Sequence, residues 1–374
     1  MNKKKKYLYL DDEKDGSVNA IIEGFNNTDI IEVEECMPDR PNFEKVIDAV
    51  AKRLKSSDGI ILDLKLNGAG EQRVPFTATT LAQYLRSFFI DKAEKEKPII
   101  LCSTKLNDNK HYQEDKTAHD LYDFTFDKSG DINYYEISKK LVSISEAYSR
   151  VQDTNSEQVL NLFGRKKLCG HPAFEPLTGE KPQANKIVSF VLKDLFTHNG
   201  PLICERTLAA RLGVDIDSCK KAWESLINKF FVEAKYSGIL SDIDNYYWND
   251  LCIKVFKSLA NDKGPAAMGA KKRVDILKKT TDLSGLKAAQ PIDLCHSDFF
   301  WTVCEGYGKP LDPTEGYMIM EENNLKSWQE PLFSSLSAFE NGVLDEKHIK
   351  LTPSEIERAK CDLELLDDTD EKKK

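Results

Sequence analysis

The chain has 374 residues, of which 40% are hydrophobic and 31% charged, and its net charge is −9. This length suits two or three domains, and the acidic balance argues against strong general affinity for nucleic acid or anionic membranes, since both bind basic faces. No apolar run approaches the roughly 20 residues of a membrane helix, and the apolar stretch near the start is too short for a signal peptide. We therefore expect a cytoplasmic protein whose nine cysteines are reduced thiols.

Five short apolar runs in the first 150 residues alternate with amphipathic segments. Such runs, bounded by turn signals, predict buried strands, and their alternation with helices predicts a parallel sheet. The fold class expected for this part is therefore α/β, with a doubly wound, five-stranded parallel sheet of the flavodoxin-like type. The expected strands span residues 7–10, 30–36, 59–64, 98–103 and 121–128; the expected helices span 18–25, 43–54, 79–89 and 137–151, with a weaker one at 109–120.

Polar residues follow four of these strands. Asp11 and Asp12 follow the first strand, Asp63 and Ser103 end the third and fourth, and Lys128 follows the fifth. Because a doubly wound sheet has its ligand crevice outside the carboxyl ends of the strands, these side chains are expected in one pocket. Three carboxylates repel one another there unless a cation is present, and oxygen ligands of this kind suit Mg²⁺. A lysine and a hydroxyl beside them predict contact with a phosphoryl group.

This order of residues resembles the receiver domain of bacterial two-component response regulators, the CheY-like fold, over roughly residues 5–150, and we expect a receiver domain at residues 1–150. The resemblance implies that Asp63, within the sequence ILDLKLNG, is the phosphoacceptor. Its carboxylate would attack a phosphohistidine of a sensor histidine kinase, or a small phosphodonor, and form an acyl phosphate. Mg²⁺ and Lys128 would neutralise the phosphoryl oxygens.

The same resemblance assigns the remaining residues of the site. It implies that Asp12 binds Mg²⁺ directly, that Asp11 binds it directly or through water, and that Lys65 adds its backbone carbonyl. Ser103 corresponds to the hydroxyl that hydrogen-bonds the phosphoryl group, and Lys128 to the lysine that pairs with it. A receiver that has lost the chemistry and only binds partners is the alternative.

Two positions depart from the family pattern. Receivers usually carry proline after the lysine, where this chain has Ser129, and a tyrosine or phenylalanine three residues before it, where this chain has Thr125. Both positions belong to the part of the family's site that transmits phosphorylation. An insertion at residues 69–76 lies beside the expected phosphorylation site.

Residues 151–183 contain many Gly, Pro and Lys residues and predict a linker. The pattern that follows, of helix, turn, short helix, longer helix and two strands, resembles a winged helix-turn-helix domain over residues 184–250. Residues 184–248 contain eight Lys or Arg and eight Asp or Glu residues. Because a nucleic-acid reader needs a basic footprint, the balance favours protein contact over DNA binding.

Residues 251–366 predict a mostly helical C-terminal domain, and the charge run at residues 367–374 predicts a disordered tail. The output half contains none of the common signatures of a nucleotide-binding loop, a nucleophile elbow, a zinc protease helix or a catalytic Cys-His pair. We therefore expect a phosphoprotein with at most autophosphatase activity rather than an enzyme.

The resulting hypothesis is a response-regulator-like signalling protein, phosphorylated on Asp63 by a sensor histidine kinase, that acts on a protein partner through its C-terminal domains. One alternative is a transcription regulator whose DNA binding is controlled by phosphorylation. Another is a phosphoryl sink that competes with a second receiver for one kinase, similar in layout to receiver proteins of bacterial defence signalling. Salt-dependent DNA binding would favour the first alternative, and faster loss of phosphate from the kinase's other receiver the second. A homodimer is compatible with each.

Overall fold

The structure is a computed structural model that describes residues 4–13, 16–39, 41–67, 73–91, 94–104, 116–165, 168, 170–177, 183–321 and 324–371. The chain divides into two compact units. Unit 1 contains Met1–Lys193 and Ser237–Ile243, and unit 2 contains Asp194–Tyr236 and Asp244–Lys374. Among the described residues, no helix is long and apolar enough to cross a membrane.

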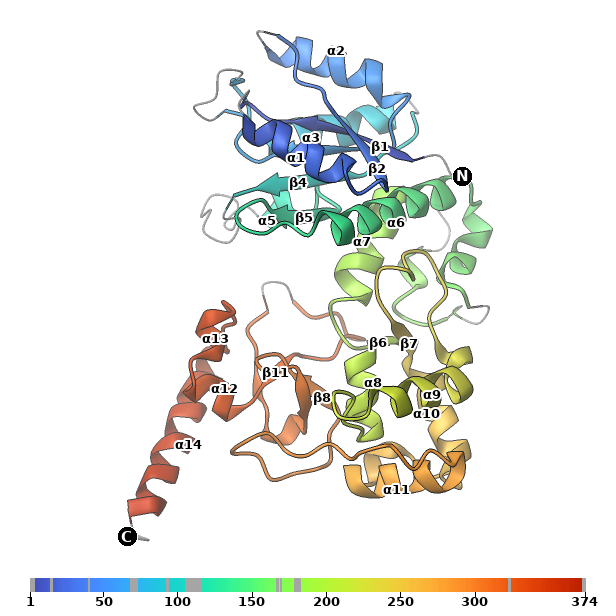
Figure 1. Ribbon diagram of the computed structural model, residues 1–374, viewed down its shortest axis with the longest axis vertical. Coiled ribbons are helices and arrows are strands. Elements are labelled where there is room, and N and C mark those ends of the chain that lie inside the picture. Colours follow the sequence, from blue (N-terminus) through green and yellow to red (C-terminus); the bar gives the residue numbers. More distant parts are fainter. Residues whose placement is uncertain are drawn as a thin grey trace. The chain divides into compact units, whose positions relative to one another are not determined.

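Unit 1 is built on a five-stranded sheet in the order β2-β1-β3-β4-β5, and every pair of neighbours is parallel (Figure 1). This confirms the α/β class and the five-stranded parallel sheet predicted from the sequence. The winding direction reverses between β1 and β3, and in doubly wound sheets ligands bind outside the carboxyl ends of the strands at such a switch point. The strands are β1 (Lys5–Leu10), β2 (Ile31–Glu35), β3 (Gly59–Asp63), β4 (Ile99–Ser103) and β5 (Phe124–Asp127).

Helices cover both faces of this sheet (Figure 1). On one face, α1 and α6 contact each other, and the Tyr7 hydroxyl of β1 donates to the carbonyl of Leu141 in α6 at 2.7 Å. On the other face, Leu8 and Leu10 pack with apolar residues of α2 and α3, as the period of two along a strand requires. These helices are α1 (Gly16–Asn26), α2 (Phe43–Leu54), α3 (Ala78–Asp91) and α6 (Tyr134–Gln152), and a short α5 (Lys116–His119) lies before β5.

The prediction of a linker at residues 151–183 is wrong for the described residues of this segment. They include two 3₁₀ helices, Ser156–Phe163 and Glu175–Leu177. The rings of Phe163 and Phe174 meet edge to face at 4.9 Å, and both side chains are buried. The Gly, Pro and Lys content suggested a linker, but a few large apolar residues suffice to pack this segment within unit 1.

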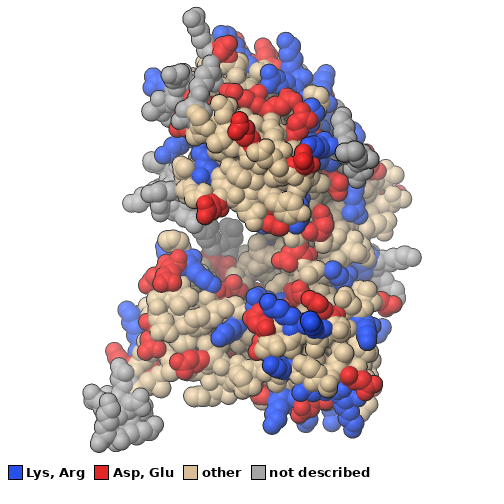
Figure 2. Space-filling model, in the orientation of Figure 1, with Lys and Arg blue, Asp and Glu red and all other residues tan. Residues whose placement is uncertain are grey.

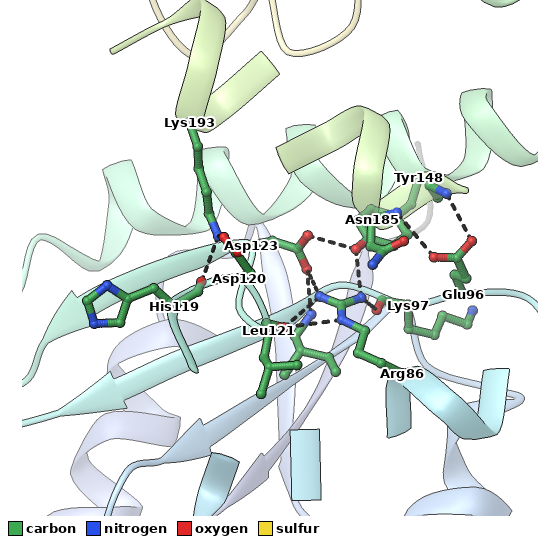
Figure 3. Close-up of polar contacts among 12 residues, drawn as sticks. Arg86, Glu96, Lys97, His119, Asp120, Leu121, Asp123, Tyr148, Asn185 and Lys193 are labelled. Atoms are coloured by element: carbon green, nitrogen blue, oxygen red, sulfur yellow. Dashed lines mark hydrogen bonds and ion pairs between the residues drawn. The ribbon is translucent and has the colours of Figure 1, made fainter. Parts of the chain in front are cut away.

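Unit 1 continues into α7 (Ala184–Ser189), which is followed by a π-helical turn at Phe190–Leu195. The Glu96 carboxylate accepts hydrogen bonds from the backbone N–H groups of Ala184 at 2.9 Å and Asn185 at 3.1 Å (Figure 3). These are two of the four N–H groups that the first turn of a helix leaves without a partner. Glu96 therefore caps α7 from the segment that precedes β4.

Lys193, the last residue of this helical segment in unit 1, is held by residues that precede β5. Lys193 Nζ donates to the carbonyl of His119 at 2.7 Å and lies 3.8 Å from Asp120 Oδ1 (Figure 3). His119 and Asp120 belong to the connection between β4 and β5. Residues 184–193, named the anchored helix below, are thus attached at both ends to segments that flank β4.

A second segment of unit 1, Ser237–Ile243, lies apart in sequence from the rest of the unit. The N–H of Ile239 donates to the carbonyl of Leu162 at 2.8 Å, and the Ser143 hydroxyl of α6 donates to Asp242. Gly164 has φ +70°, and a Cβ atom there would lie 2.8 Å from the backbone nitrogen of Gly238, so only glycine fits. We name Ser237–Ile243 the docked loop.

The elements of unit 2 up to residue 281 share one hydrophobic core with members from Ile203 to Leu286, so this core crosses the domain boundary predicted at residue 250. Of the two strands predicted at the end of residues 184–250, the structure has β7, which pairs with β6, and a single bridge from Lys235 to Tyr247. The elements are β6 (Leu202–Cys204), α8 (Glu205–Leu212), α9 (Lys220–Phe230), β7 (Tyr246–Trp248), α10 (Asn249–Leu259) and α11 (Ala270–Thr281).

The region predicted to be mostly helical also contains a four-stranded sheet in the order β10-β11-β8-β9. Its strands have two or three residues, too few for a period of two to appear in the sequence. The final helix extends to Glu371, into the stretch from residue 367 for which the sequence predicts a disordered tail, and residues 372–374 lie outside the described residues. The elements are β8 (Thr302–Cys304), β9 (Lys309–Leu311), β10 (Tyr317–Met318), β11 (Phe333–Ser334), α12 (Leu336–Glu340), α13 (Val343–Glu346) and α14 (Pro353–Glu371).

Candidate functional site

Three buried carboxylates meet at the carboxyl ends of β1 and β3. Asp11, Asp12 and Asp63 are 2%, 3% and 5% exposed, and one carboxylate oxygen from each lies within 4.8 Å of the others. Among the described residues, this is the only group of His, Cys, Asp and Glu side chains that approach one another so closely. Three ionised carboxylates buried at this separation repel one another unless a cation lies between them.

Lys128 supplies one cation from the end of β5. Its Nζ lies 2.9 Å from Asp11 Oδ2 and 2.8 Å from Asp63 Oδ1, and the side chain is 11% exposed. Burial disfavours the charged amine, but the charges and hydrogen bonds of Asp63 and Asp11 outweigh it and raise the pKa of Lys128. The lysine is therefore cationic at neutral pH and bridges two of the three carboxylates.

Each carboxylate oxygen of Asp63 contacts a nitrogen of a neighbouring lysine residue. The N–H of Lys65 donates to Asp63 Oδ2 at 2.8 Å, while Oδ1 faces Lys128. Burial raises the pKa of Asp63, the charge of Asp11 raises it further, and Lys128 opposes both. The Lys65 side chain is exposed, so the contact of this residue with the site is made by its backbone.

Ser103 ends β4, beside Asp63 on one side and Lys128 on the other. In the register of the sheet, Asp63 pairs with Cys102 and Ser103 with Asp127, and the N–H of Lys128 donates to the Ser103 carbonyl at 2.8 Å. The Ser103 hydroxyl is buried and donates to the Thr104 carbonyl at 3.4 Å. A hydrogen bond of this length is weak, which leaves the hydroxyl able to turn toward a ligand.

The two departures from the receiver pattern lie on the surface of unit 1. Thr125 is exposed within β5, and Ser129 is exposed in the turn after Lys128, where its N–H donates to Asp127. Of the expected insertion at residues 69–76, residues 69–72 lie outside the described residues, while Val74 and Phe76 are buried with α3. Among the described residues, Thr125 and Ser129 therefore make no recorded hydrogen bond or ion pair with the acidic triad.

Sequence reasoning missed one residue of the site. Tyr9 is fully buried in β1, and its hydroxyl donates to Asp11 Oδ2 at 2.9 Å. Burial raises the pKa of Tyr9, and the charge of Asp11 adds to this, so the hydroxyl keeps its proton. The signal was present in the spacing, because residues two apart in a strand face the same side, and Tyr9 stands two before Asp11.

Taken together, the five predicted side chains Asp11, Asp12, Asp63, Ser103 and Lys128 lie at one edge of the sheet. The three carboxylates offer hard oxygen ligands of the type that bind divalent cations such as magnesium, calcium or manganese. Lysine and serine add donors for an anion beside that cation. No model of a protein family matches the chain, and no curated protein is significantly similar to it.

Proposed function

We propose that the chain is a response-regulator-like signalling protein that accepts a phosphoryl group on Asp63 from a sensor histidine kinase. The observation that carries the proposal is the buried acidic triad bridged by Lys128 at the switch point of a five-stranded parallel sheet. Ligands of doubly wound sheets bind at this switch point. A kinase partner of this kind would act on the protein in the cytoplasm.

The chain's own residues account for most of the transfer. A carboxylate oxygen of Asp63 forms a bond to phosphorus while the phosphorus–nitrogen bond of the phosphohistidine breaks, and the leaving imidazole takes a proton. Lys128 moves from its carboxylate partners to one phosphoryl oxygen. The Ser103 hydroxyl donates a hydrogen bond to another phosphoryl oxygen. Asp11, Asp12, Asp63 and the Lys65 carbonyl would hold Mg²⁺, which supplies further neutralisation of the phosphoryl charge.

The Asp63→Asn substitution is expected to abolish phosphorylation, because an amide is no nucleophile. Intact mass is measured after incubation with Mg²⁺ and acetyl phosphate or phosphoramidate. The wild type is expected to gain one phosphoryl group, and the variant and the sample without Mg²⁺ none. Asp127→Asn, at an exposed carboxylate of the same sheet edge, is the matched control and should behave as the wild type. A gain that survives Asp63→Asn would refute Asp63 as the acceptor.

The anchored helix and the docked loop support a relay from this site to the C-terminal domains. Both belong to unit 1, and the chain passes from each directly into unit 2. Phosphorylation adds about −1.5 to −2 charges, which can draw Ser103 and the end of β4 inward. β4 pairs with β5, and His119 and Asp120, just before β5, hold Lys193 of the anchored helix.

Phosphorylation is therefore expected to raise amide hydrogen exchange in residues 184–193 and 237–243. The reason is that a shift of the β4–β5 connection weakens the Lys193 contact and, through α6, the docked loop. Exchange is measured by mass spectrometry with and without phosphodonor, with Asp63→Asn as control and α2 as a reference segment. Unchanged exchange in a chain that intact mass shows to be phosphorylated would contradict the relay.

The contacts of the docked loop within unit 1 weigh against DNA binding as the output. We infer that the part of residues 184–250 that belongs to unit 2 has a winged-helix-like arrangement, since a strand, two helices and a second strand follow one another from residue 202 to 248. The loop before the second strand is the docked loop, whose Ile239 is fully buried and so unavailable to a DNA backbone. Acidic and basic residues are interspersed on the face in Figure 2. We therefore favour a protein that binds the C-terminal domains as the recipient of the phosphorylation signal.

A further inference from the structure

Two tyrosines of β1 point to the same face of the sheet but make different hydrogen bonds. Both Tyr7 and Tyr9 are fully buried. The Tyr7 hydroxyl contacts α6, through the Leu141 carbonyl at 2.7 Å and the Ser145 hydroxyl at 2.6 Å. The Tyr9 hydroxyl instead donates to Asp11 Oδ2 at 2.9 Å. Only the second bond reaches the acidic triad.

Protein donors engage both carboxylate oxygens of Asp11. Oδ2 accepts from the Tyr9 hydroxyl and from Lys128 Nζ, each at 2.9 Å, and Oδ1 accepts from the N–H of Glu13 at 3.1 Å. Lys128 is also paired with Asp63 and must move if it is to contact a phosphoryl group. Tyr9 and Glu13 would then be the donors that still fix the direction of the Asp11 carboxylate.

We propose that Tyr9 is a positioning residue whose hydroxyl holds Asp11 in the orientation that the metal site requires and so sets the affinity of that site for Mg²⁺. This inference rests on the proposed function, because it concerns the same acidic triad. Groups that hydrogen-bond a metal-binding carboxylate orient it, and their removal typically weakens metal binding about 10- to 100-fold. A phenylalanine fills the same space in the core and, within the described part of the chain, leaves Lys128 as the remaining donor to Oδ2 of Asp11.

The test compares Tyr9→Phe with Tyr7→Phe, which removes a buried hydroxyl from the same strand and face without touching the triad. Mg²⁺ affinity is measured by calorimetry, and the tyrosine ultraviolet difference spectrum is recorded on addition of Mg²⁺. Tyr9→Phe is expected to weaken affinity by about tenfold and to remove the tyrosine signal. Tyr7→Phe should keep both, and circular dichroism should show all three proteins folded.

A second pair of variants shows whether Tyr9 acts through Asp11. In an Asp11→Asn background, Tyr9→Phe is expected to have no further effect on Mg²⁺ affinity, because the acceptor that it positions has lost its charge. Equal affinities of wild type and Tyr9→Phe would overturn the proposal, as would an undiminished effect in the Asp11→Asn background. If affinity falls as expected while wild type gains no phosphoryl group from its donors, the proposed function fails and the positioning role stands. If instead the wild type gains a phosphoryl group while Tyr9→Phe leaves Mg²⁺ affinity unchanged, the positioning role of Tyr9 is rejected and the proposed function stands.

Discussion

The Asp123→Ala substitution is expected to lower the free energy of unfolding by about 3–5 kcal/mol, because it leaves a buried arginine without its counter-charge. Arg86 of α3 and Asp123, which precedes β5, form an ion pair at 2.8 Å with side chains 11% and 2% exposed (Figure 3). Burial opposes the charge of Arg86, yet Asp123 and Tyr148 outweigh it and raise the pKa of the guanidinium. Because the ordinary pKa of a guanidinium lies far above neutral pH, the arginine stays charged when Asp123 is removed.

Further hydrogen bonds make Asp123 the centre of a buried network. Its carboxylate accepts from the Tyr148 hydroxyl at 2.7 Å and from the N–H of Ile99 at 2.8 Å, and Arg86 donates to the Leu121 carbonyl at 2.8 Å. Asp123 and Ile99 stand at the amino ends of β5 and β4, the opposite edge of the sheet from Asp63. The substitution thus tests the stability of unit 1 without changing the acidic triad.

Urea denaturation of single and double variants measures this effect. The combination of Arg86→Met with Asp123→Ala is expected to cost less than the sum of the two changes, because it removes both charges. The matched control is Asp153→Ala, whose partner Lys95 lies at 3.5 Å with both side chains more than two-thirds exposed. Its expected change is within about 0.5 kcal/mol. Equal costs for Asp123→Ala and Asp153→Ala would show that the network adds nothing to stability.

The sheet and its acidic edge were predictable because both depend on short-range patterns. Each apolar run marks a strand, and a polar residue at its end needs only the parallel arrangement to reach its neighbours. The registers of Asp63 with Cys102 and of Ser103 with Asp127 then follow from the sheet. The sequence placed Lys128 in the same pocket beside a phosphoryl group, but its pairing with Asp11 and Asp63 came only from the structure.

The anchored helix and the docked loop were not predictable, because their contacts join residues far apart in sequence. Glu96 reads as an exposed loop acid until α7 brings two N–H groups to it. Likewise, Asp242 lies in a Gly and Asp-rich segment typical of a hairpin turn, and its partner Ser143 lies on a distant helix. The local pattern carries no information on either pairing.

Replacing Lys128 with methionine is expected to lower the rate of phosphoryl uptake about 100- to 1,000-fold, because the transferred group loses its fixed cation. The same change leaves the triad uncompensated, which should cost about 3–5 kcal/mol of folding free energy without Mg²⁺ at neutral pH. Lys65→Met is the matched control, since the exposed Lys65 side chain lies beside Asp63 and contacts it only through the backbone.

The pH dependence of the folding free energy lost in Lys128→Met distinguishes an electrostatic role of Lys128 from a packing role. The pKa of Asp63 is raised in the folded state by burial and by Asp11, so the folded protein binds this proton more tightly than the unfolded chain. Stability from this group is present below its ordinary pKa and falls as pH rises through the raised value. Lys128 opposes the rise, so the fall is expected to be larger, and to extend to higher pH, in Lys128→Met.

Thermal unfolding at about pH 5 and about pH 7.5, with and without Mg²⁺, measures this dependence. The deficit of Lys128→Met is expected to grow with pH, and Mg²⁺ should restore most of it at the higher value by binding the ionised triad. A deficit independent of both pH and Mg²⁺ would mean that Lys128 stabilises the fold through packing. The lysine and the metal ion would then not be alternative cations for one set of carboxylates, and the proposed transfer of Lys128 to the phosphoryl group would lose its physical basis.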